Sequence, residues 1–362
     1  MVFGNKIPYE GAIGTSIAKV FDMTVAASGL PAKRLKQAGI DYLSATIHSG
    51  SHAGYYPDAL QMSIKITFSP ADGKLLGAQI VGYSGVDKRI DEFSQVIKHN
   101  GTVYDLMALE QAYAPPFSSA KDPVAVTGYV AGNILNGKMQ PLYWRELQAA
   151  DWSKVTLVDV RTPDEFALGA LKGAVNIPLD DMRDRMKEIP RDKPVYLYCG
   201  VGLRGYLASN ILLQNGYKEV KNLIGGLKLY KAATTPLPEP KEFSNSGSSS
   251  SDSSKVDHSE HSKDSAEAYT IASSVIPSMK AIKVDACGIS CPGPIMKLKK
   301  SMEELADGER LEIVATDAGF PRDAEAWCHT TGNRFVSVNS GAGKYQVIVC
   351  LLYTSPSPRD TR

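Results

Sequence analysis

Apolar and polar residues in the first third of the chain predict one hairpin followed by helices. Residues 62–68 alternate between apolar and polar side chains, 75–81 form a second apolar run, and S-P-A-D-G-K between them is rich in turn residues. This combination predicts a β-hairpin. Helices are expected at 86–99, in a short segment stopped by Pro115 and Pro116, and at 125–135. The region is therefore expected to be an α+β unit.

From about residue 140, short apolar strands alternate with helices. Strands are predicted at 155–160, 195–198 and 220–223, and helices from Pro163 and at 206–214. Strands that alternate with helices form βαβ units, which place parallel strands in one sheet. We expect a second unit with an α/β fold and a mainly parallel sheet.

The C-terminal region predicts a small two-layer unit in the order βαβαββ. Its strands are expected at 282–285, 311–315, 334–338 and 345–350, and its helices at 292–305 and 321–330. Between this unit and the previous one, residues 234–268 are rich in Ser, Pro and charged residues, a composition that cannot bury enough apolar surface to fold. A flexible linker of this length spans roughly 30–35 Å.

These patterns divide the chain into units at 1–135, 140–233 and 280–350, with a disordered linker at 234–270 and a tail at 351–362. The tail has no periodic pattern, and its Ser-Pro repeats favour extended coil. We interpret the tail as non-native.

Charge and cysteine content exclude several classes of protein. The 40 basic and 39 acidic residues leave a net charge of +1, which gives no global field to hold a nucleic acid. We find no run of the ~20 apolar residues that a membrane helix needs and no pattern of a secretory signal. Five widely spaced cysteines argue against a secreted disulfide scaffold. We expect a cytoplasmic protein whose cysteines carry chemistry, with neither nucleic acid nor membrane as a partner.

The first candidate nucleophile is Cys199, which follows the predicted strand at 195–198. The loop is rich in glycine and ends with an arginine, in the order Cys199, Gly200, Val201, Gly202, Leu203, Arg204, Gly205. Glycines let backbone N–H groups point inward, the next helix presents its positive end, and Arg204 adds a full charge. All three favour a thiolate. The alternative is an inert cysteine at the end of a buried strand.

The second candidate is Cys291, in the sequence Cys287-Gly-Ile-Ser-Cys291-Pro292. Pro292 suits the first turn of a helix, which places Cys291 near the N-cap, where the helix dipole lowers the pKa of a thiol. A zinc site built from Cys287, Cys291, Cys328 and His329 is the metal alternative. Because adjacent ligands and C-x₃-C spacing fit tetrahedral zinc poorly, we expect no metal.

The region around Cys199 resembles the rhodanese family. The resemblance includes L-V-D-V-R-T-P-D-E-F at 157–166, G-A-V-N-I-P at 173–178 and G-G-L at 225–227. In that family the loop cysteine takes up a sulfane sulfur as a persulfide and passes it to a thiophile, which implies this role for Cys199. Asp159 and Arg161 are expected to tie the base of the loop. Related phosphatases have one residue more than the four between Cys199 and Arg204, so the short loop favours sulfur over phosphate.

The sequence Cys291-Pro-Gly-Pro294 resembles the Cys-Pro-x-Pro motif of TusA-like sulfur carriers. Asp317 and the turn Gly332-Asn333 fit the later pattern of that family. The resemblance implies that Cys291 holds a persulfide in transit. Cys287 either resolves that persulfide as a disulfide or is a passive residue at the end of a strand.

Residues 1–135 resemble the C-terminal dimerisation domain of flavin-dependent pyridine nucleotide-disulfide oxidoreductases, and most closely the coenzyme A-disulfide reductase group. The matching stretches include H-A-G-Y-Y-P at 52–57, G-V-D-K-R-I-D at 85–91 and Y-A-P-P-F at 113–117. In such enzymes this domain pairs two subunits and offers tyrosines to the disulfide site of the partner. Tyr55 or Tyr56, and Tyr113, occupy the corresponding motifs, and packing in a dimer seam is the alternative for them.

The resemblance implies that this chain is the C-terminal part of a longer reductase whose flavin and nicotinamide domains precede residue 1. We expect no G-x-G-x-x-G dinucleotide fingerprint after a strand and no cofactor in the chain, with FAD and NAD(P)H in the full-length parent. The predicted function is a sulfurtransferase relay, in which Cys199 accepts sulfane sulfur and Cys291 receives it. The expected partners are a sulfur donor, a thiol acceptor such as coenzyme A, and a second copy of the chain bound through 1–135. The alternative is a non-catalytic module for dimerisation and sulfur carriage.

Overall fold

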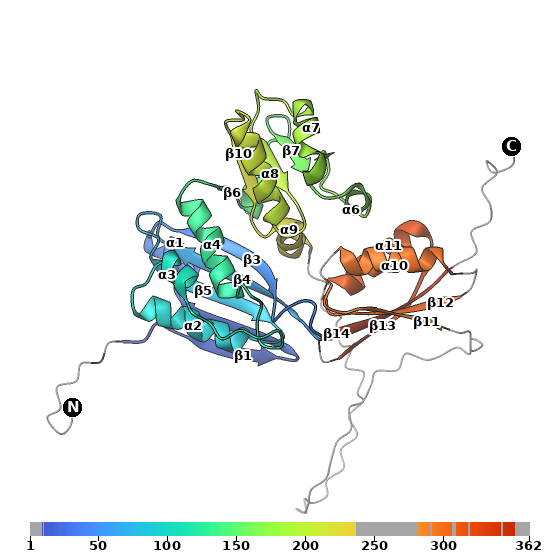
Figure 1. Cartoon of the computed structure of the whole chain (residues 1–362), viewed down its shortest axis with the longest axis horizontal. Coiled ribbons are helices and arrows are strands. Elements are labelled where there is room, and N and C mark those ends of the chain that lie inside the picture. The colour runs from blue at the N-terminus through green and yellow to red at the C-terminus, as the bar shows by residue number, and fades with distance from the viewer. Residues whose placement is uncertain are drawn as a thin grey trace, which may run out of the picture.

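The computed structural model of this chain describes residues 9, 11–236, 281–289, 292–305, 309–317, 319–341 and 343–351, without the side chains of 281, 329 and 330. Cys291, the linker from 237 onward and the tail after 351 lie outside these described residues. The described residues form three sheets, each with its own helices, and the three sheets define the units named first, second and third below (Figure 1).

The first unit is an antiparallel five-stranded sheet in the order β1-β2-β5-β4-β3. Its strands are β1 (Ser16–Val20), β2 (Met23–Gly29), β3 (Leu43–Gly50), β4 (Gln61–Phe68) and β5 (Leu75–Gly82). Its helices are α1 (Ala32–Ala38), α2 (Val86–Lys98), α3 (Val103–Ala108) and α4 (Pro123–Leu135). The β4–β5 hairpin confirms the prediction from the alternating pattern.

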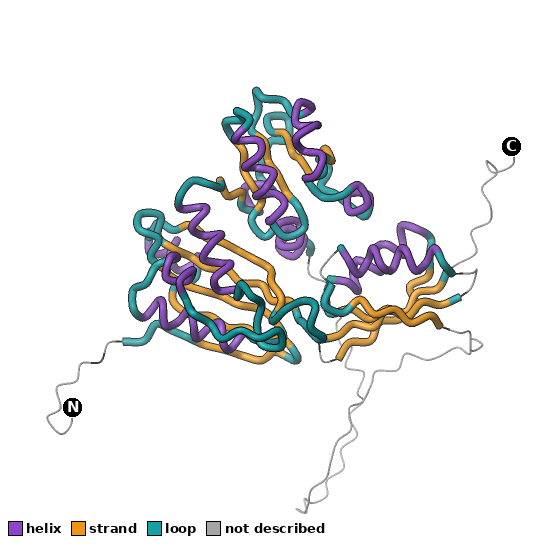
Figure 2. Tube along the Cα trace, in the orientation of Figure 1, coloured by secondary structure: helices purple, strands orange, loops and turns teal. Residues whose placement is uncertain are grey.

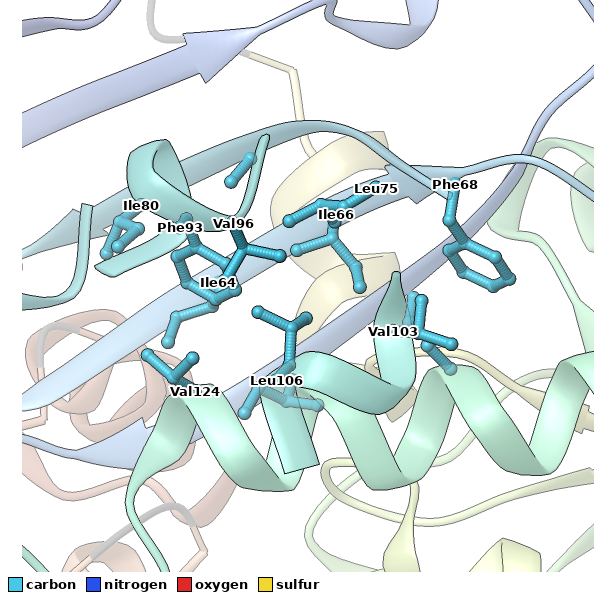
Figure 3. Close-up of a cluster of buried hydrophobic side chains, with 14 of the residues drawn as sticks. Ile64, Ile66, Phe68, Leu75, Ile80, Phe93, Val96, Val103, Leu106 and Val124 are labelled. Carbon is cyan, nitrogen blue, oxygen red and sulfur yellow. The ribbon is translucent and has the colours of Figure 1, made fainter. Parts of the chain in front are cut away.

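The core of the first unit lies between the sheet and helices α2, α3 and α4, which cover one of its faces (Figure 1). Figure 3 shows side chains from both layers meeting there: Ile64, Ile66, Phe68, Leu75 and Ile80 from the strands, and Phe93, Val96, Val103, Leu106 and Val124 from the helices. Strand residues alternate between this core and the opposite face because successive side chains of a strand point to opposite sides.

The second unit is a parallel sheet in the order β6-β10-β9-β7-β8. Its strands are β6 (Gln140–Leu142), β7 (Thr156–Asp159), β8 (Val175–Asn176), β9 (Val195–Tyr198) and β10 (Val220–Leu223). Its α-helices are α5 (Trp144–Gln148), α6 (Pro163–Ala167), α7 (Met182–Arg185), α8 (Leu203–Gln214) and α9 (Gly226–Thr234). Because the strands are parallel, the loops after β7, β9 and β10 meet at the same edge of the sheet.

The third unit has the predicted βαβαββ order, with sheet order β11-β12-β14-β13. Its elements are β11 (Ala281–Ala286), α10 (Gly293–Glu303), β12 (Arg310–Ala315), α11 (Phe320–Thr331), β13 (Arg334–Gly341) and β14 (Lys344–Cys350). Both helices cover one face of the sheet, as the tube in Figure 2 shows. The expected combination of an α+β unit, a parallel α/β unit and a small two-layer unit is confirmed.

Several elements differ from the sequence predictions. The helix before Pro115 ends at Ala108, because Leu109 already has an extended backbone, so the prolines do not stop it. Helix α8 begins at Leu203 rather than at 206. Helix α9 was not predicted, and it includes Thr234, the first residue that we assigned to the linker.

Polar side chains make several of the contacts between the units. The hydroxyl of Tyr143 in the second unit bonds both the backbone N–H and the carbonyl of Ser44 in the first, each at 3.2 Å. The hydroxyls of Tyr83 and Tyr345 pair the first unit with the third, and the Lys344 ammonium lies 2.5 Å from Asp58. Among the described residues, no helix is long and apolar enough to cross a bilayer.

Candidate functional site

Cys199 lies at the carboxyl end of β9, where the chain turns into α8. Its side chain is 1% exposed, and the backbone N–H of Gly202 donates a hydrogen bond to its sulfur at 3.1 Å. Gly202 is the N-cap of α8 and has a φ of 115°, a conformation that favours glycine. The sulfur therefore lies beside the positive end of a twelve-residue helix, which stabilises a negative charge.

A second glycine turn, at the start of α9, packs against the backbone of the Cys199 loop. Gly226 has a φ of 59°, and a Cβ placed on it would lie 2.5 Å from the Gly200 carbonyl oxygen and 2.6 Å from that of Cys199. The next two residues, Leu227 and Lys228, donate backbone hydrogen bonds to the same two carbonyls at 2.8 and 3.0 Å. Helix α9 thus fixes the course of the loop through its first turn.

Arg204 is held in place by Glu165. The guanidinium donates two hydrogen bonds to the carboxylate, at 2.5 and 2.7 Å, and Glu165 is in turn the N3 residue of a capping box with Thr162 on α6. The Glu165 hydrogen bond, and then the Cys199 sulfur, raise the pKa of Arg204. A permanent cation is therefore fixed beside the sulfur by a carboxylate that the sequence analysis had not assigned.

Replacing Glu165 by glutamine is expected to cost about 1–3 kcal/mol of unfolding free energy at pH 7, because Arg204 loses a charged partner. Burial acts to raise the pKa of Glu165, but hydrogen bonds from Arg204 and Thr162 outweigh it and leave the pKa below 4.5. The stabilisation is therefore present above pH 4.5 and lost as the pH falls through the lowered folded pKa. Urea unfolding from pH 7 to pH 3 measures it. If the difference in unfolding free energy between the unmutated chain and Glu165→Gln does not decrease as the pH falls, Glu165 does not stabilise the fold as a carboxylate.

Asp159 is the last residue of β7, and Arg161 follows two residues later, at the edge of the sheet that carries the site. The Arg161 guanidinium bonds the Asp159 carboxylate at 2.6 and 3.0 Å, and both side chains are almost fully buried. The Asn176 amide bonds the backbone carbonyls of both residues. These contacts tie the end of β7 to Asn176 of β8 and, through the Gly169 carbonyl, to the segment after α6, and the role at the base of the Cys199 loop stays a prediction.

The prediction that no G-x-G-x-x-G spacing follows a strand is wrong. Gly200, Gly202 and Gly205 do have G-x-G-x-x-G spacing between a strand and a helix. The structure shows why a dinucleotide does not fit there. The N-terminus of α8 is occupied by the Cys199 sulfur, which takes the place where a pyrophosphate would bind.

In the third unit, Cys287 lies half-buried at the end of β11. Burial, together with the neighbouring Asp285 carboxylate, raises the pKa of its thiol to about 11. A thiol of that pKa is protonated at neutral pH and is a poor nucleophile, which favours the passive interpretation. Cys291 lies outside the described residues, so its proposed role stays a prediction. Among the described residues, no three His, Cys, Asp or Glu side chains are grouped to hold a metal ion.

The predicted tyrosines gather on two neighbouring loops of the first unit. The Tyr55 and Tyr113 hydroxyls are 3.1 Å apart, both rings are exposed, and Tyr56 packs edge-on against His52. Buried Arg89 connects the two loops. It donates to the Ser51 carbonyl in the loop of Tyr55 and to the Asp122 carboxylate at the end of the loop of Tyr113. The structure therefore brings Tyr55 and Tyr113 together as an exposed pair.

The residues that sequence reasoning missed are Glu165, Gly226 and Lys228. Glu165 and Gly226 belong to the motifs that carried the family resemblance, and the capping box T-P-D-E was a readable signal for Glu165. Lys228 had no such signal, because its side-chain contacts come from other units of the chain.

Three family models match the chain. The pyridine nucleotide-disulphide oxidoreductase dimerisation domain matches residues 15–124, the rhodanese-like domain matches 143–233, and sulfurtransferase TusA matches 282–350.

Curated relatives and solved structures agree with the family models. The coenzyme A disulfide reductase of Staphylococcus epidermidis is 40% identical over 127 residues, which are 35% of this chain and 28% of the relative. That of Staphylococcus haemolyticus is 41% identical over 132 residues, 36% of this chain and 30% of the relative. The crystal structure of reduced Bacillus anthracis CoADR-RHD is 49% identical, with a TM-score of 0.60 over 62% of this chain and 40% of that one. A NAD-dependent persulfide reductase from A. fulgidus is 36% identical, with a TM-score of 0.56 and the same coverage.

The chain spans less than a third of the length of these curated relatives. Each of its three sheets corresponds to one of the three matched segments, except that strand β6 precedes the rhodanese match and Ala281 of β11 precedes the TusA match. The chain therefore combines, in one polypeptide, a dimerisation domain of the pyridine nucleotide-disulphide oxidoreductases, a rhodanese-like domain and a TusA domain.

Proposed function

We propose that this chain is a sulfur relay, in which Cys199 accepts a sulfane sulfur and transfers it to Cys291. The observation that carries the proposal is the position of the Cys199 sulfur. It lies 3.1 Å from the Gly202 N–H at the N-terminus of α8, beside an arginine held by Glu165. These groups stabilise a negative charge on sulfur, whether on the free thiolate or on the terminal sulfur of a persulfide.

Uptake needs no cofactor. With thiosulfate as donor, the Cys199 thiolate attacks the outer sulfur, a new S–S bond forms, and the bond within thiosulfate breaks as sulfite leaves with the electron pair. In the transfer step the Cys291 thiolate attacks the terminal sulfur of the Cys199 persulfide, and Cys199 leaves as a thiolate. Sulfur changes carrier without a net oxidation or reduction of the protein.

The first unit supports a wider proposal about the parent enzyme. The dimerisation domain and the exposed pair Tyr55 and Tyr113 fit a homodimer in which these phenols approach the disulfide site of the partner. One relative is named a persulfide reductase and others coenzyme A disulfide reductases. A parent with FAD and NAD(P)H that acts on coenzyme A disulfide or a persulfide is consistent with those names. The two cysteines of the relay both belong to this chain.

The relay is tested by loading the chain with thiosulfate or polysulfide, blocking thiols and locating a mass increase of one sulfur atom by peptide mass spectrometry. We expect the added sulfur first on Cys199 and then on Cys291. Extra sulfur on neither residue would refute the proposal.

A non-catalytic function in dimerisation and sulfur carriage is the second candidate, and the 1% exposure of Cys199 favours it. It predicts that sulfur transfer from thiosulfate to cyanide is unchanged when Cys199 is replaced. A phosphatase would instead hydrolyse aryl phosphates in a Cys199-dependent manner, and we expect no such activity from a loop of this length.

A further inference from the structure

Lys228, on the first turn of α9, connects all three units. Its backbone N–H donates to the carbonyl of Gly200 in the Cys199 loop at 3.0 Å. Its ammonium lies 3.3 and 3.4 Å from the two carboxylate oxygens of Asp317 in the third unit, and it also donates to the side-chain carbonyl of Gln61 on β4. One residue thus contacts the loop of the first nucleophile and a carboxylate of another domain.

Asp317 is close to the chain segment that leads to Cys291. Its side chain is 2% exposed, and its carboxylate accepts the backbone N–H of Gly319 at 2.8 Å, at the start of α11. The preceding residue, Thr316, accepts a hydrogen bond from the N–H of Gly288 at 2.9 Å, three residues before Cys291. The contact between Lys228 and Asp317 therefore links the loop of Cys199 to the base of the Cys291 loop.

A second contact between the same two units supports this arrangement. Leu168, after α6, packs against the core of the third unit. Leu168 also lines a cleft of about 300 Å³ together with Pro292 and Trp327 of the third unit. Because Pro292 follows Cys291 directly, the cleft places the start of α10 opposite the second unit.

The neighbouring imidazole of His48 leaves Lys228 as the cation that faces Asp317 in this region. His48 bonds the Gly225 carbonyl through Nε2 at 3.2 Å and the Ser63 hydroxyl through Nδ1 at 2.8 Å. Burial, and then the Lys228 cation, lower the pKa of His48 to about 4, so the imidazole is neutral at physiological pH. A neutral imidazole does not compete with Lys228 for the carboxylate.

We propose that Lys228 and Asp317 form the docking contact through which the rhodanese domain recognises the TusA domain for sulfur transfer. This inference rests on the relay proposed above. Lys228 is a positioning residue, because the reacting atoms are the sulfurs of Cys199 and Cys291, and the contact brings the two loops together. An ion pair in which Asp317 is almost fully buried discriminates more strongly than a surface pair, because a wrong partner removes the Lys228 cation from a carboxylate that is shielded from water.

The test measures the first-order rate at which sulfur moves from loaded Cys199 to Cys291 in the full chain, by rapid quench and peptide mass spectrometry. Expressing the rate per loaded Cys199 separates transfer from uptake. We expect Lys228→Gln and Asp317→Asn each to slow transfer about tenfold, and Lys218→Gln, which removes an exposed lysine of the same unit, to leave it unchanged. The rate of the unmutated chain should fall as salt rises, and that of Lys228→Gln should change less.

The exchanged pair Lys228→Asp with Asp317→Lys distinguishes docking from a structural role. Recovery to within about threefold of the unmutated rate supports the ion pair, whereas a double variant as slow as either single variant overturns it. Equal transfer rates in the unmutated chain, Lys228→Gln and Asp317→Asn also overturn the docking contact and leave the relay intact. Sulfur that never reaches Cys291 in the unmutated chain refutes the relay, and the docking contact with it.

Discussion

Replacing Cys199 by serine is expected to abolish the uptake of sulfane sulfur, with a loss on the order of 10³-fold or more in sulfur transfer from thiosulfate to cyanide. A serine hydroxyl is not ionised at neutral pH, even beside the Gly202 N–H and Arg204, and it forms no persulfide. In a sequential relay, sulfur should be missing from Cys291 as well. Peptide mass spectrometry after thiosulfate loading measures both positions in one experiment.

Two further variants establish the order of transfer. Cys291→Ser should keep a persulfide on Cys199, because uptake precedes transfer, and should accumulate it. Cys350→Ser, which changes a half-buried cysteine on β14, is the matched control and should load as the unmutated chain does. If Cys291 acquires sulfur in the Cys199→Ser variant at the usual rate, the relay is wrong and Cys291 is loaded directly.

The second large effect is expected from Gly226→Ala. The new methyl group would lie 2.5 and 2.6 Å from two carbonyl oxygens of the Cys199 loop, at a φ of 59° that alanine adopts poorly. Backbone strain and the forced shift together should cost more than about 2 kcal/mol. Because displacing a reacting group by about 1 Å costs on the order of 10²-fold in rate, sulfur uptake should fall by a similar factor.

Amide hydrogen exchange locates the backbone that Gly226→Ala disturbs. The amides of Leu227 and Lys228 donate to the carbonyls that the methyl group displaces, so their exchange should accelerate in Gly226→Ala. Gly173→Ala is the matched control, since Gly173 also has a positive φ, of 80°, but a Cβ there meets no atom within 4 Å. Gly173→Ala should lower the unfolding free energy by about 1 kcal/mol and leave sulfur uptake by Cys199 unchanged. Similar losses of uptake in both variants would mean that the close approach at Gly226 does not position the loop.

Local patterns predicted part of the fold: strands β1, β2 and β3 and helix α1 of the first unit, and β6, α5, β8 and α7 of the second, were not predicted. The alternation at 62–68 and the turn after it predicted the hairpin β4–β5, and the α/β alternation predicted a parallel sheet. Helix α9 escaped prediction, because glycine is both its N-cap and its first residue and its apolar residues pack on the rest of the second unit. The helix before Pro115 was misjudged, because Leu109 leaves the helical conformation without any proline.

The candidate site divides in the same way. The sequence by itself was enough to identify the candidate nucleophile, the arginine and the glycine loop, since the groups that favour a thiolate lie within a few residues of the same chain segment. Only the tertiary structure decided that Glu165 holds Arg204, that Gly226 supports the loop, and that Lys228 reaches Asp317. These partners are 26 to 89 residues away from the groups that they contact, and no local spacing encodes such a distance. They meet because parallel strands deliver their loops to one edge of the sheet, and because a separate domain packs against that edge.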